Sequence, residues 1–283
     1  MVIIKTVYEM HSFSREKKRE GKTIALVPTM GFLHEGHLSL VKKAKQVADV
    51  VVVSIFVNPT QFAPNEDFTK YPRDEKRDKE LLEELNVDAL FIPDAEEIYS
   101  KDFQTYVEVR EITKTLEGEF RPTHFKGVTT IVAILFNCVM PDISIFGQKD
   151  AQQAAVIMRM VKDLKFGIDI IVEPIIRESD GLAMSSRNVY LNEKERNDAL
   201  VLYKSLLYSK SKIENGEREV DKIVGGMKEI INSVNTSQLD YIQVVNSMNF
   251  SAVEKLTEGT EYNILIACRI GKTRLIDNIM VKI

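Results

Sequence analysis

The sequence is poor in several features on which large classes of proteins depend. It contains no tryptophan, two cysteines and four histidines in 283 residues. Its apolar stretches, of which Val50–Val57 is among the longest, fall far short of the roughly 20 residues that a membrane-spanning helix needs. The first residues also lack the long apolar core and the small-residue cleavage site of a signal peptide. We therefore expect a cytoplasmic protein that has no membrane partner.

The charge balance and the cysteine positions limit the partners and the compartment further. The chain carries 38 Lys and Arg against 42 Asp and Glu, a formal net charge of -4. No overall positive field is then present to hold a polyanion by releasing its counterions, so nucleic acid is not expected as a partner. Cys138 and Cys268 lie far apart among apolar residues, which indicates two buried side chains and a reducing compartment.

Three widespread catalytic or nucleotide-binding motifs are absent as well. The sequence has no G-x-x-x-x-G-K-[ST] loop, no G-x-G-x-x-G fingerprint and no G-x-S-x-G elbow. The first two wrap glycine-rich backbone around phosphates, and the third exposes a serine nucleophile on a tight turn. Their absence weighs against P-loop kinases, dinucleotide-dependent dehydrogenases and serine hydrolases of the α/β class.

Short apolar, β-branched segments alternate with helical patterns over about the first 176 residues. Strands that helices cover on both faces lose their polar alternation, so such segments indicate buried parallel strands. The predicted strands are Thr23–Val27, Asp49–Val57, Asp88–Ile92, Ile143–Phe146 and Ile168–Val172. Between them apolar residues recur at helical spacing, for example in Val128–Val139. The alternation predicts an α/β fold with a doubly wound parallel sheet.

A different pattern follows Pro174. Two helical stretches are predicted first, near Glu193–Asn215 and Glu219–Val234. Helices followed by neighbouring strands predict a small α+β domain with an antiparallel sheet. We expect a larger domain over residues 1–176 and a smaller C-terminal domain over residues 177–283. The predicted strands of the smaller domain are Leu239–Val245, Tyr262–Ala267 and Arg274–Val281.

The segment PTMGFLHEGHLSLVKKA joins the end of a predicted strand to an amphipathic helix that begins near Glu35 or Gly36. Open parallel sheets bind ligands at the carboxyl ends of their strands, and a helix N-terminus offers N–H groups to phosphate. Gly31 and Gly36 permit close backbone approach. His34 and His37 are three residues apart, so we expect them on one helical face, where both imidazoles can donate to phosphate oxygens.

The two histidines admit two other interpretations. Zinc sites of the His-Glu-x-x-His type place their histidines four residues apart, whereas the spacing here is three, so zinc is disfavoured. A purely structural use of each histidine in capping the helix stays open. Half of the chain's four histidines lie in this one turn, which favours phosphate binding.

The segment SIFVNPTQFAPNEDFTKYPRD begins at the end of another predicted strand. Asn58 and Gln61 carry amides, which fix a polar substrate through both a donor and an acceptor. On this segment alone, a surface loop with Asn-Pro turn chemistry is the favoured interpretation. Solvated charges are likewise favoured over magnesium ligands for its acidic residues and those just beyond it. These residues are Glu66, Asp67, Asp74 and Asp78.

Two further segments carry residues suited to phosphate. In DISIFGQKDAQQAAVIMRM, Lys149 can reach polyphosphate as a point charge, Asp150 can cap the helix that follows, and Gln153 faces the same end. In RESDGLAMSSRN, Ser185 and Arg187 supply a hydroxyl and a guanidinium fork. A hinge or an N-cap is the alternative for that loop, but its place between the predicted domains favours a lid over nucleotide.

Together these segments closely resemble the pantothenate synthetase family. The matching stretches, in family order over about residues 28–188, are PTMGFLHEGH, FVNPTQF, EDFTKYPR, RPTHFKGVTT, PDISIFGQKDAQQ and RESDGLAMSSRN. The resemblance implies a Rossmann-like nucleotidyltransferase fold and the condensation of D-pantoate with β-alanine, with ATP as co-substrate. It also implies a pantoyl adenylate, formed with release of pyrophosphate and consumed with release of AMP.

The resemblance further implies which residues bind ATP and which take part in catalysis, with His37 as the proton donor. The implied catalytic set comprises His37, His34, Lys149, Ser185 and Arg187. The implied ATP site comprises Met30, Gly31, Phe32, Leu33, His34, Glu35, Gly36, His37, Gly147, Gln148, Lys149, Asp150, Ile176, Met184, Ser185, Ser186 and Arg187.

For the other substrates, the resemblance implies that Gln61 and Gln153 hold pantoate, with Gln61 also near β-alanine, and that Asn58 steadies the substrate end. The chain departs from the family pattern at Arg77 and Asp78, where some relatives have paired acids. No protein ligand is then assigned to magnesium, and we expect Mg²⁺ to bind mainly through ATP phosphates. By the same resemblance the protein is expected to form a homodimer through its N-terminal domain.

Two other functions remain open. Another nucleotidyltransferase, one that stops at an adenylylated product, would share the first and last segments, although Gln61 and Gln153 favour a small hydroxy acid. A non-catalytic nucleotide-binding regulator would bind ATP without releasing pyrophosphate.

Overall fold

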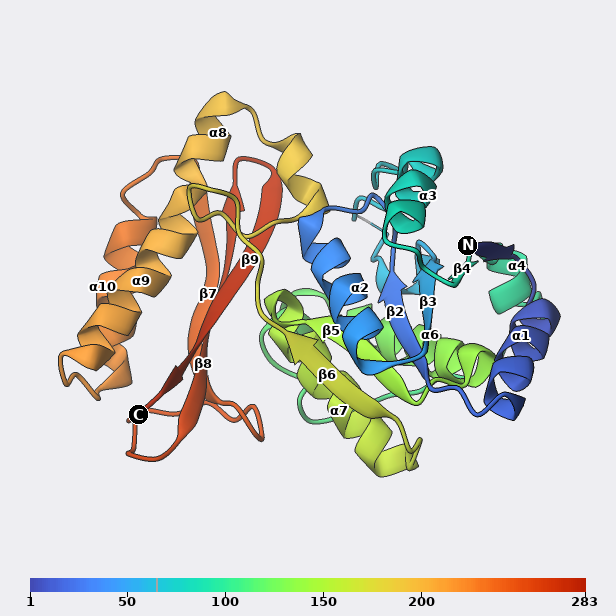
Figure 1. Ribbon diagram of the computed structural model, residues 1–283. Helices are drawn as coiled ribbons and strands as arrows, with labels where there is room; N and C mark the ends of the chain where they lie inside the picture. The colour runs from blue at the N-terminus through green and yellow to red at the C-terminus, as the bar shows by residue number, and fades with distance from the viewer. Residues whose placement is uncertain (65) are drawn as a thin grey trace. The chain divides into compact units, whose positions relative to one another are not determined.

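The computed structural model describes residues 1–64 and 66–283 of the chain. These residues form two compact units, each with its own sheet and buried core (Figure 1). The first unit comprises Met1–Gly147 and Val156–Pro174, and the second comprises Gln148–Ala155 and Ile175–Ile283. The boundary between two domains at residue 176 stays a prediction.

The first unit is built on a six-stranded parallel sheet with the order β1-β4-β3-β2-β5-β6. Its strands are β1 (Val2–Ile4), β2 (Ile24–Thr29), β3 (Val50–Ile55), β4 (Ala89–Phe91), β5 (Ile143–Gly147) and β6 (Asp169–Glu173). All five segments predicted as strands therefore form strands, and the predicted α/β class with a parallel sheet is confirmed. The short edge strand β1 was not among the predicted segments.

Helices cover both faces of this sheet (Figure 1). One buried cluster joins the strands to α1, α6 and α7, and a second joins them to α2 and α3. The α-helices are α1 (Val7–Arg19), α2 (Glu35–Val47), α3 (Glu75–Glu84), α4 (Ala95–Ile98), α5 (Glu117–Phe120), α6 (His124–Val139) and α7 (Ala151–Leu164), and the 3-10 turns are η1 (Pro59–Gln61) and η2 (Gln148–Asp150).

The central strands have apolar side chains on both faces because both faces are covered. In β2, Ile24 and Leu26 belong to the cluster of α1 and α6, whereas Ala25 and Val27 belong to the cluster of α2 and α3. All four side chains are fully buried. Burial of a Val, Leu or Ile side chain stabilises a fold by about 1.5–3 kcal/mol, so neither face tolerates a polar residue at these positions.

The strand order reverses direction between β2 and β5. From β2 the chain builds the sheet outwards through β3 and β4, and it then returns to place β5 on the other side of β2, followed by β6. In open parallel sheets, ligands bind outside the carboxyl ends of the strands at such a reversal. The turn after β2 therefore lies where this fold class places its ligands.

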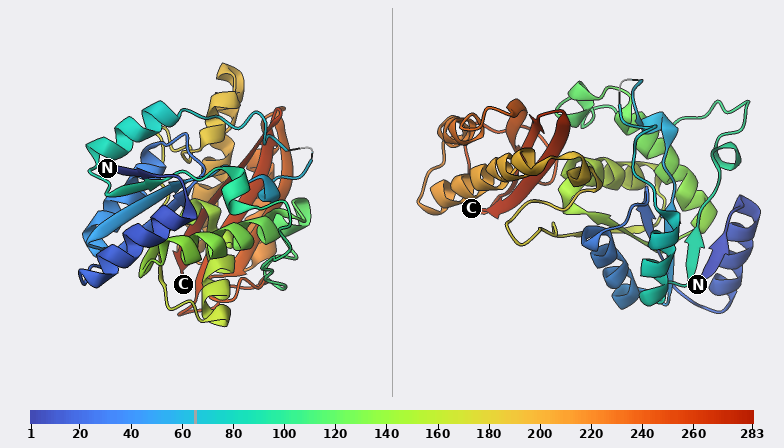
Figure 2. Two further views of the ribbon diagram at one scale, coloured as in Figure 1. Left: turned by 90° about the vertical axis from the view of Figure 1, so that its right-hand side faces the viewer. Right: turned by 90° about the horizontal axis from the view of Figure 1, so that it is seen from above.

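The second unit has a three-stranded antiparallel sheet, with α9 and α10 packed along one face (Figures 1 and 2). The predicted order of helices followed by antiparallel strands is confirmed. The single helical stretch predicted over 193–215 is divided at Ala199 into two helices. The elements are η3 (Ser186–Tyr190), α8 (Glu193–Asp198), α9 (Leu200–Glu214), α10 (Val220–Ile231), β7 (Ser237–Asn246), β8 (Glu261–Ile270) and β9 (Thr273–Lys282).

Cys138 and Cys268 are both buried as free thiols, as their apolar surroundings predicted. Burial raises the pKa of each thiol to about 11. Over residues 1–64 and 66–283, no helix combines the length and the apolar character needed to cross a bilayer.

Candidate active site

The turn between β2 and α2 has an unusual backbone conformation. Gly31 has a φ of 81°, and Phe32, which is not a glycine, has a φ of 50°. A Cβ atom on residue 31 would lie 3.0 Å from Cγ2 of Ile55 and 3.1 Å from Oδ2 of Asp78. Position 31 therefore requires glycine for two reasons, its left-handed φ and the lack of space for a side chain.

Two residues of α3 hold this turn in place. Phe32 N donates to Oδ2 of Asp78 and Leu33 N donates to Oδ1, each at 2.7 Å, while Nη1 of Arg77 donates to the Leu33 carbonyl at 2.9 Å. Asp78 is 1% exposed, so its interpretation as a solvated charge is wrong. Burial raises the pKa of this carboxyl group, and the two backbone donors oppose that shift. Both carboxylate oxygens are thus used to shape the turn.

His34 and His37 form a reciprocal cap at the start of α2. Gly36 N donates to Nδ1 of His34 at 3.1 Å, and His34 N donates to Nδ1 of His37 at 3.3 Å. The two rings lie 4.1 Å apart between centroids. The start of the helix at Glu35 is confirmed, but His34 is the N-cap residue and does not lie on a helical face. Because each neutral ring accepts at Nδ1, its proton lies on Nε2, which makes Nε2 a donor in both histidines.

The amide pair after β3 is buried and well connected. Asn58 is 1% exposed; its Oδ1 accepts from Thr60 N, the Thr60 hydroxyl and the Tyr99 hydroxyl, the last at 2.8 Å. Its Nδ2 donates to the Gly127 carbonyl at 3.1 Å and to Oε1 of Gln61 at 3.2 Å. Asn58 therefore acts on Gln61 by orienting its side-chain amide.

Gln61 in turn connects this segment to the turn after β2. Its Nε2 donates to Sδ of Met30 at 2.9 Å, and the residue is 8% exposed. The interpretation of Asn58 and Gln61 as part of a surface loop is therefore wrong, although Asn58 does cap the 3-10 turn η1 as Asn-Pro chemistry predicts. The first two predicted segments meet at Met30 and Gln61.

A buried network that the sequence did not reveal contacts the backbone carbonyl of Gln61. Nδ1 of His124 lies 3.1 Å and Nη2 of Arg121 lies 3.3 Å from the Gln61 carbonyl oxygen, and Arg121 also pairs with Glu66 at 2.7 Å. Burial and the neighbouring Arg121 lower the pKa of His124 to about 4. Neutral His124 then donates through Nδ1 and accepts from Arg121 at Nε2, at 3.3 Å. The stretch RPTHF was visible in the sequence, but nothing local to it indicates its partner at Gln61.

The acidic residues considered for magnesium have other partners or remain untested. Glu66 is engaged by Arg121, and Asp78 by two backbone amides. Within residues 1–64 and 66–283, no group of three or more His, Cys, Asp or Glu side chains is arranged to hold a metal ion.

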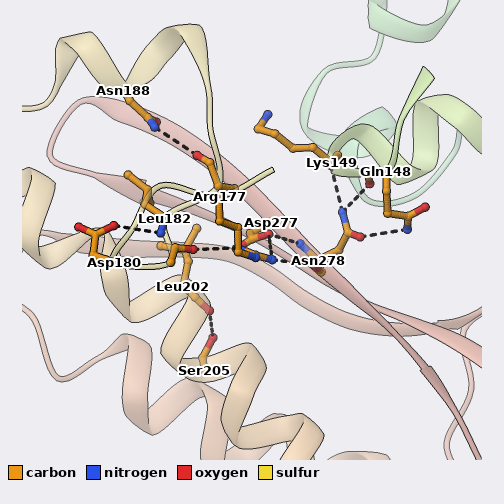
Figure 3. Close-up of polar contacts among 12 residues, drawn as sticks. Gln148, Lys149, Arg177, Asp180, Leu182, Asn188, Leu202, Ser205, Asp277 and Asn278 are labelled. Atoms are coloured by element: carbon orange, nitrogen blue, oxygen red, sulfur yellow. Dashed lines mark hydrogen bonds and ion pairs between the residues drawn. The ribbon is translucent and has the colours of Figure 1, made fainter. Parts of the chain in front are cut away.

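In the second unit, Asn278 of the antiparallel sheet holds the backbone of the turn η2 (Figure 3), and Asn263 contacts the Gln148 side chain. Nδ2 of Asn278 donates to the carbonyl oxygens of Gln148 and Lys149 at 2.9 and 3.0 Å. Nε2 of Gln148 donates to Oδ1 of Asn278 and to Oδ1 of Asn263, both at 3.1 Å. The Lys149 side chain is 22% exposed, and its Nζ lies 4.0 Å from Oδ2 of Asp150. The backbone around Lys149 is therefore held by the sheet, while its side chain remains partly exposed.

The loop 176–187 is a narrow hairpin that leads into η3. Met184 N donates to the Ile176 carbonyl at 3.0 Å, so the two ends of the hairpin lie side by side. Oγ of Ser185 accepts from Arg187 N at 3.3 Å and caps η3, which is the N-cap use considered from the sequence. Ser186 is buried, and Arg187 is half-buried.

The predicted site residues are divided between the two units, one group in each. The group of the first unit comprises Met30, Gly31, Phe32, Leu33, His34, Glu35, Gly36, His37, Asn58, Gln61 and, at the end of β5, Gly147. The group of the second unit comprises Gln148, Lys149, Asp150, Gln153, Ile176, Met184, Ser185, Ser186 and Arg187. Leu33 is 1% exposed and packs in the core, so only its backbone can face a ligand.

Comparison with known proteins supplies an independent finding. The family described as pantoate-β-alanine ligase matches residues 2–280 of the chain. The pantothenate synthetase of Fervidobacterium nodosum is 54% identical over 281 residues, which cover 99% of each chain. The pantothenate synthetase of Caldicellulosiruptor bescii is 52% identical over 282 residues, which cover 100% of this chain and 99% of that protein.

Solved structures agree with the sequence relatives. A crystal structure of pantothenate synthetase from Thermus thermophilus superposes with a TM-score of 0.94 at 41% identity and covers 100% of both chains. A crystal structure of pantoate-β-alanine ligase from Francisella tularensis, complexed with β,γ-ATP and β-alanine, has a TM-score of 0.80 at 36% identity. That match covers 99% of this chain and 97% of the Francisella chain.

Proposed function

The chain belongs to the pantoate–β-alanine ligase family and is an ATP-dependent ligase that joins pantoate to β-alanine; we propose that it does so through a pantoyl adenylate. The pantoate carboxylate attacks the α-phosphorus of ATP and displaces pyrophosphate. The amine of β-alanine then attacks the acyl carbon of the adenylate and displaces AMP. A carboxylate becomes a competent acyl donor only when its oxygen carries a good leaving group, and the protein's task is then to position groups and stabilise charge.

The observation that carries this proposal is the reciprocal cap of His34 and His37. It places two imidazole rings with protonated Nε2 atoms at the N-terminus of a thirteen-residue helix, at the strand reversal where this fold class binds ligands. Donors in that place suit the negative charge that grows on the phosphates as pyrophosphate leaves. We assign His34 and His37 to the phosphates, with His37 as the proton donor.

Pantoate binding is assigned to Gln61 and Gln153. Gln61 has its amide oriented by Asn58 and Met30, so its donor and acceptor directions are fixed before substrate arrives. A hydroxy acid presents both kinds of partner to such an amide. Asn58, whose own polar atoms contact protein groups, serves the substrate through Gln61.

The second unit supplies positive charge for the phosphates through Lys149 and Arg187, with Ser185 as a hydroxyl donor. Mg²⁺ is assigned to the ATP phosphates, because the carboxylates of Glu66 and Asp78 already contact Arg121 and backbone amides. A lid role for residues 177–283, a homodimer and a cytoplasmic location complete the proposal.

Product analysis tests the proposal. The purified chain is incubated with ATP, Mg²⁺ and D-pantoate, with and without β-alanine, and pyrophosphate, AMP and pantothenate are measured. We expect pyrophosphate in the presence of pantoate, and AMP with pantothenate only after β-alanine is added. Pyrophosphate with a different adenylylated product would indicate another nucleotidyltransferase. ATP binding without any pyrophosphate would indicate a non-catalytic regulator.

A further inference from the structure

Two neighbouring residues of β9, Asp277 and Asn278, are buried polar side chains on opposite faces of the antiparallel sheet. They are 3% and 1% exposed. Successive side chains of a strand alternate between faces, and Leu275 and Val281, which share the face of Asp277, pack in the core with α9 and α10. Asn278 therefore lies on the face away from those helices. Buried polar groups in such positions need a structural or functional reason.

Asn278 makes its contacts with the turn η2. Its Nδ2 donates to the carbonyl oxygens of both Gln148 and Lys149, and its Oδ1 accepts from Nε2 of Gln148 (Figure 3). One side chain thus satisfies two carbonyl groups and one side-chain donor of the turn. The position of the Lys149 backbone is set by this asparagine.

Asp277 makes its contacts with the base of the hairpin 176–187. Its two carboxylate oxygens accept from Nη1 and Nη2 of Arg177 at 2.7 and 2.9 Å. The same guanidinium donates to the Gly181 carbonyl within the hairpin and to the Asn278 carbonyl on β9, and it stacks over the Tyr203 ring at 4.0 Å. A bidentate pair of this kind fixes direction as well as distance. Arg177 therefore anchors the base of the hairpin to β9.

We propose that Asp277 and Asn278 are positioning residues. Through them, β9 holds both segments of the second unit that carry a cation, the turn η2 with Lys149 and the loop with Arg187. Asn278 positions the backbone of Lys149, and Asp277 positions the loop Met184–Arg187 through Arg177. Asp277 and Asn278 are adjacent in β9. The positions of these two segments relative to each other are then fixed by one peptide unit. The inference rests on the proposed function, because it concerns groups assigned there to the phosphates.

The physical reason for holding both segments on one strand is preorganisation. Charged donors stabilise a transition state best when they need no rearrangement during the reaction, and a displacement of about 1 Å can cost on the order of 10²-fold in rate. A β-strand paired along its whole length to β8 is a stiff support for this purpose. Lysine and arginine side chains are themselves flexible, so the rigid part must lie in the backbone that carries them.

Asn278→Ala tests the contact to η2, with Asn263→Ala as the matched control. Asn263 is also buried, lies on the neighbouring strand β8, and accepts from the same Gln148 side chain, but it does not hold the two backbone carbonyls. For pyrophosphate release we expect kcat to fall by about 10-fold to 100-fold in Asn278→Ala, with KM for pantoate unchanged. Asn263→Ala is expected to keep kcat within about 3-fold of the original chain. Equal losses in the two variants contradict the inference.

A double-mutant cycle separates positioning from general support of the fold. If Asn278 acts through Lys149, then Asn278→Ala causes no further loss of kcat in a chain that already carries Lys149→Ala. Multiplicative losses would show that Asn278 acts by another route. Asn278→Asp provides a second variant, since it keeps the acceptor for Gln148 but replaces the donor to both carbonyls by an oxygen. We expect it to lose at least as much kcat as Asn278→Ala.

A measurement on the unaltered chain does not depend on whether the variants fold. If β9 holds both segments, the backbone amides at 148–151 and at 177–184 exchange with deuterium through openings that have the same free energy. Denaturant then lowers the free energy of both openings by the same amount. Independent openings overturn the inference. Failure of the proposed function would appear separately, as absence of pyrophosphate from the unaltered chain.

Discussion

The two groups of site residues differ in how the chain holds them. In the first unit, His34 and His37 cap each other across three residues, and Asn58 contacts Gln61 across three. In the second unit, Arg177 is held by a residue 100 positions away, and the Lys149 carbonyl by one 129 positions away. The first group thus combines contacts between near neighbours with distant partners such as Asp78 and His124, whereas the backbone around Lys149 in the second group is held by a distant sheet. Contacts between residues close together in the sequence can be predicted from it, whereas contacts between distant residues cannot.

Replacing one catalytic candidate in each unit compares the groups most directly. We expect His37→Ala and Lys149→Ala each to lower kcat by about 10²–10³-fold, because each removes a donor that acts mainly in the transition state. Pyrophosphate release under saturating ATP and pantoate measures the effect. His11→Ala in α1 and Lys162→Ala in α7 are matched controls outside the proposed site. Normal turnover in either test variant would remove that residue from the catalytic set.

The network of His124 predicts that the first unit responds to pH. The pKa of His124 is about 4 in the folded chain against an ordinary value of 6.5. Between these values the unfolded chain binds the proton and the folded chain does not, so stability falls as pH falls. We expect His124 to account for a loss of up to about 3 kcal/mol in the free energy of unfolding between pH 6.5 and 4.

Denaturant unfolding at several pH values measures this loss, and His124→Gln provides the reference. Carboxyl groups also titrate near the lower limit, so the quantity to compare is the difference between the two chains. A difference that does not change with pH would mean that His124 titrates normally in the folded chain.

The smallest expected effect concerns one of the distant contacts that shape the first group, between Asp78 and the turn after β2. Asp78→Asn leaves one of the two amides of the turn, Phe32 N or Leu33 N, without its acceptor. Loss of one such buried hydrogen bond costs about 1–3 kcal/mol of stability. Unfolding midpoints in urea measure the change. Asp74→Asn, at the exposed cap of the same helix, is the control and is expected to cost less. An unaltered midpoint in Asp78→Asn would show that the turn holds its shape without α3.

The fold was predictable where one physical requirement dominates. Strands buried on both faces must be apolar throughout, and all five predicted strands of the first sheet carry that pattern. The edge strand β1 has three residues and is half exposed, so it has too short a pattern to recognise. The break at Ala199 between α8 and α9 was missed because the sequence there continues to favour helix on both sides.

The candidate site was predictable to the extent that its residues lie together in the sequence. The turn after β2, the amide pair and the loop 184–187 all stand in contiguous segments, and the family resemblance rests on these same segments. Asp78 was interpreted as a solvated charge, because its partners lie 45 and 46 positions away and an acidic residue on a polar helix is usually exposed. Asp277 and Asn278 were missed for the same reason.

The two buried thiols have a practical consequence for measuring motion. With a thiol pKa of about 11, only about one molecule in 10⁴ carries a thiolate at pH 7, and both sulfur atoms lie in apolar cores. Alkylating dyes therefore have almost nothing to react with in the natural chain. Cysteines introduced at exposed positions such as Tyr8 and Met248, one in each unit, would accept a fluorophore pair without prior removal of native cysteines. Energy transfer between the dyes would then follow the separation of the two units through a catalytic cycle.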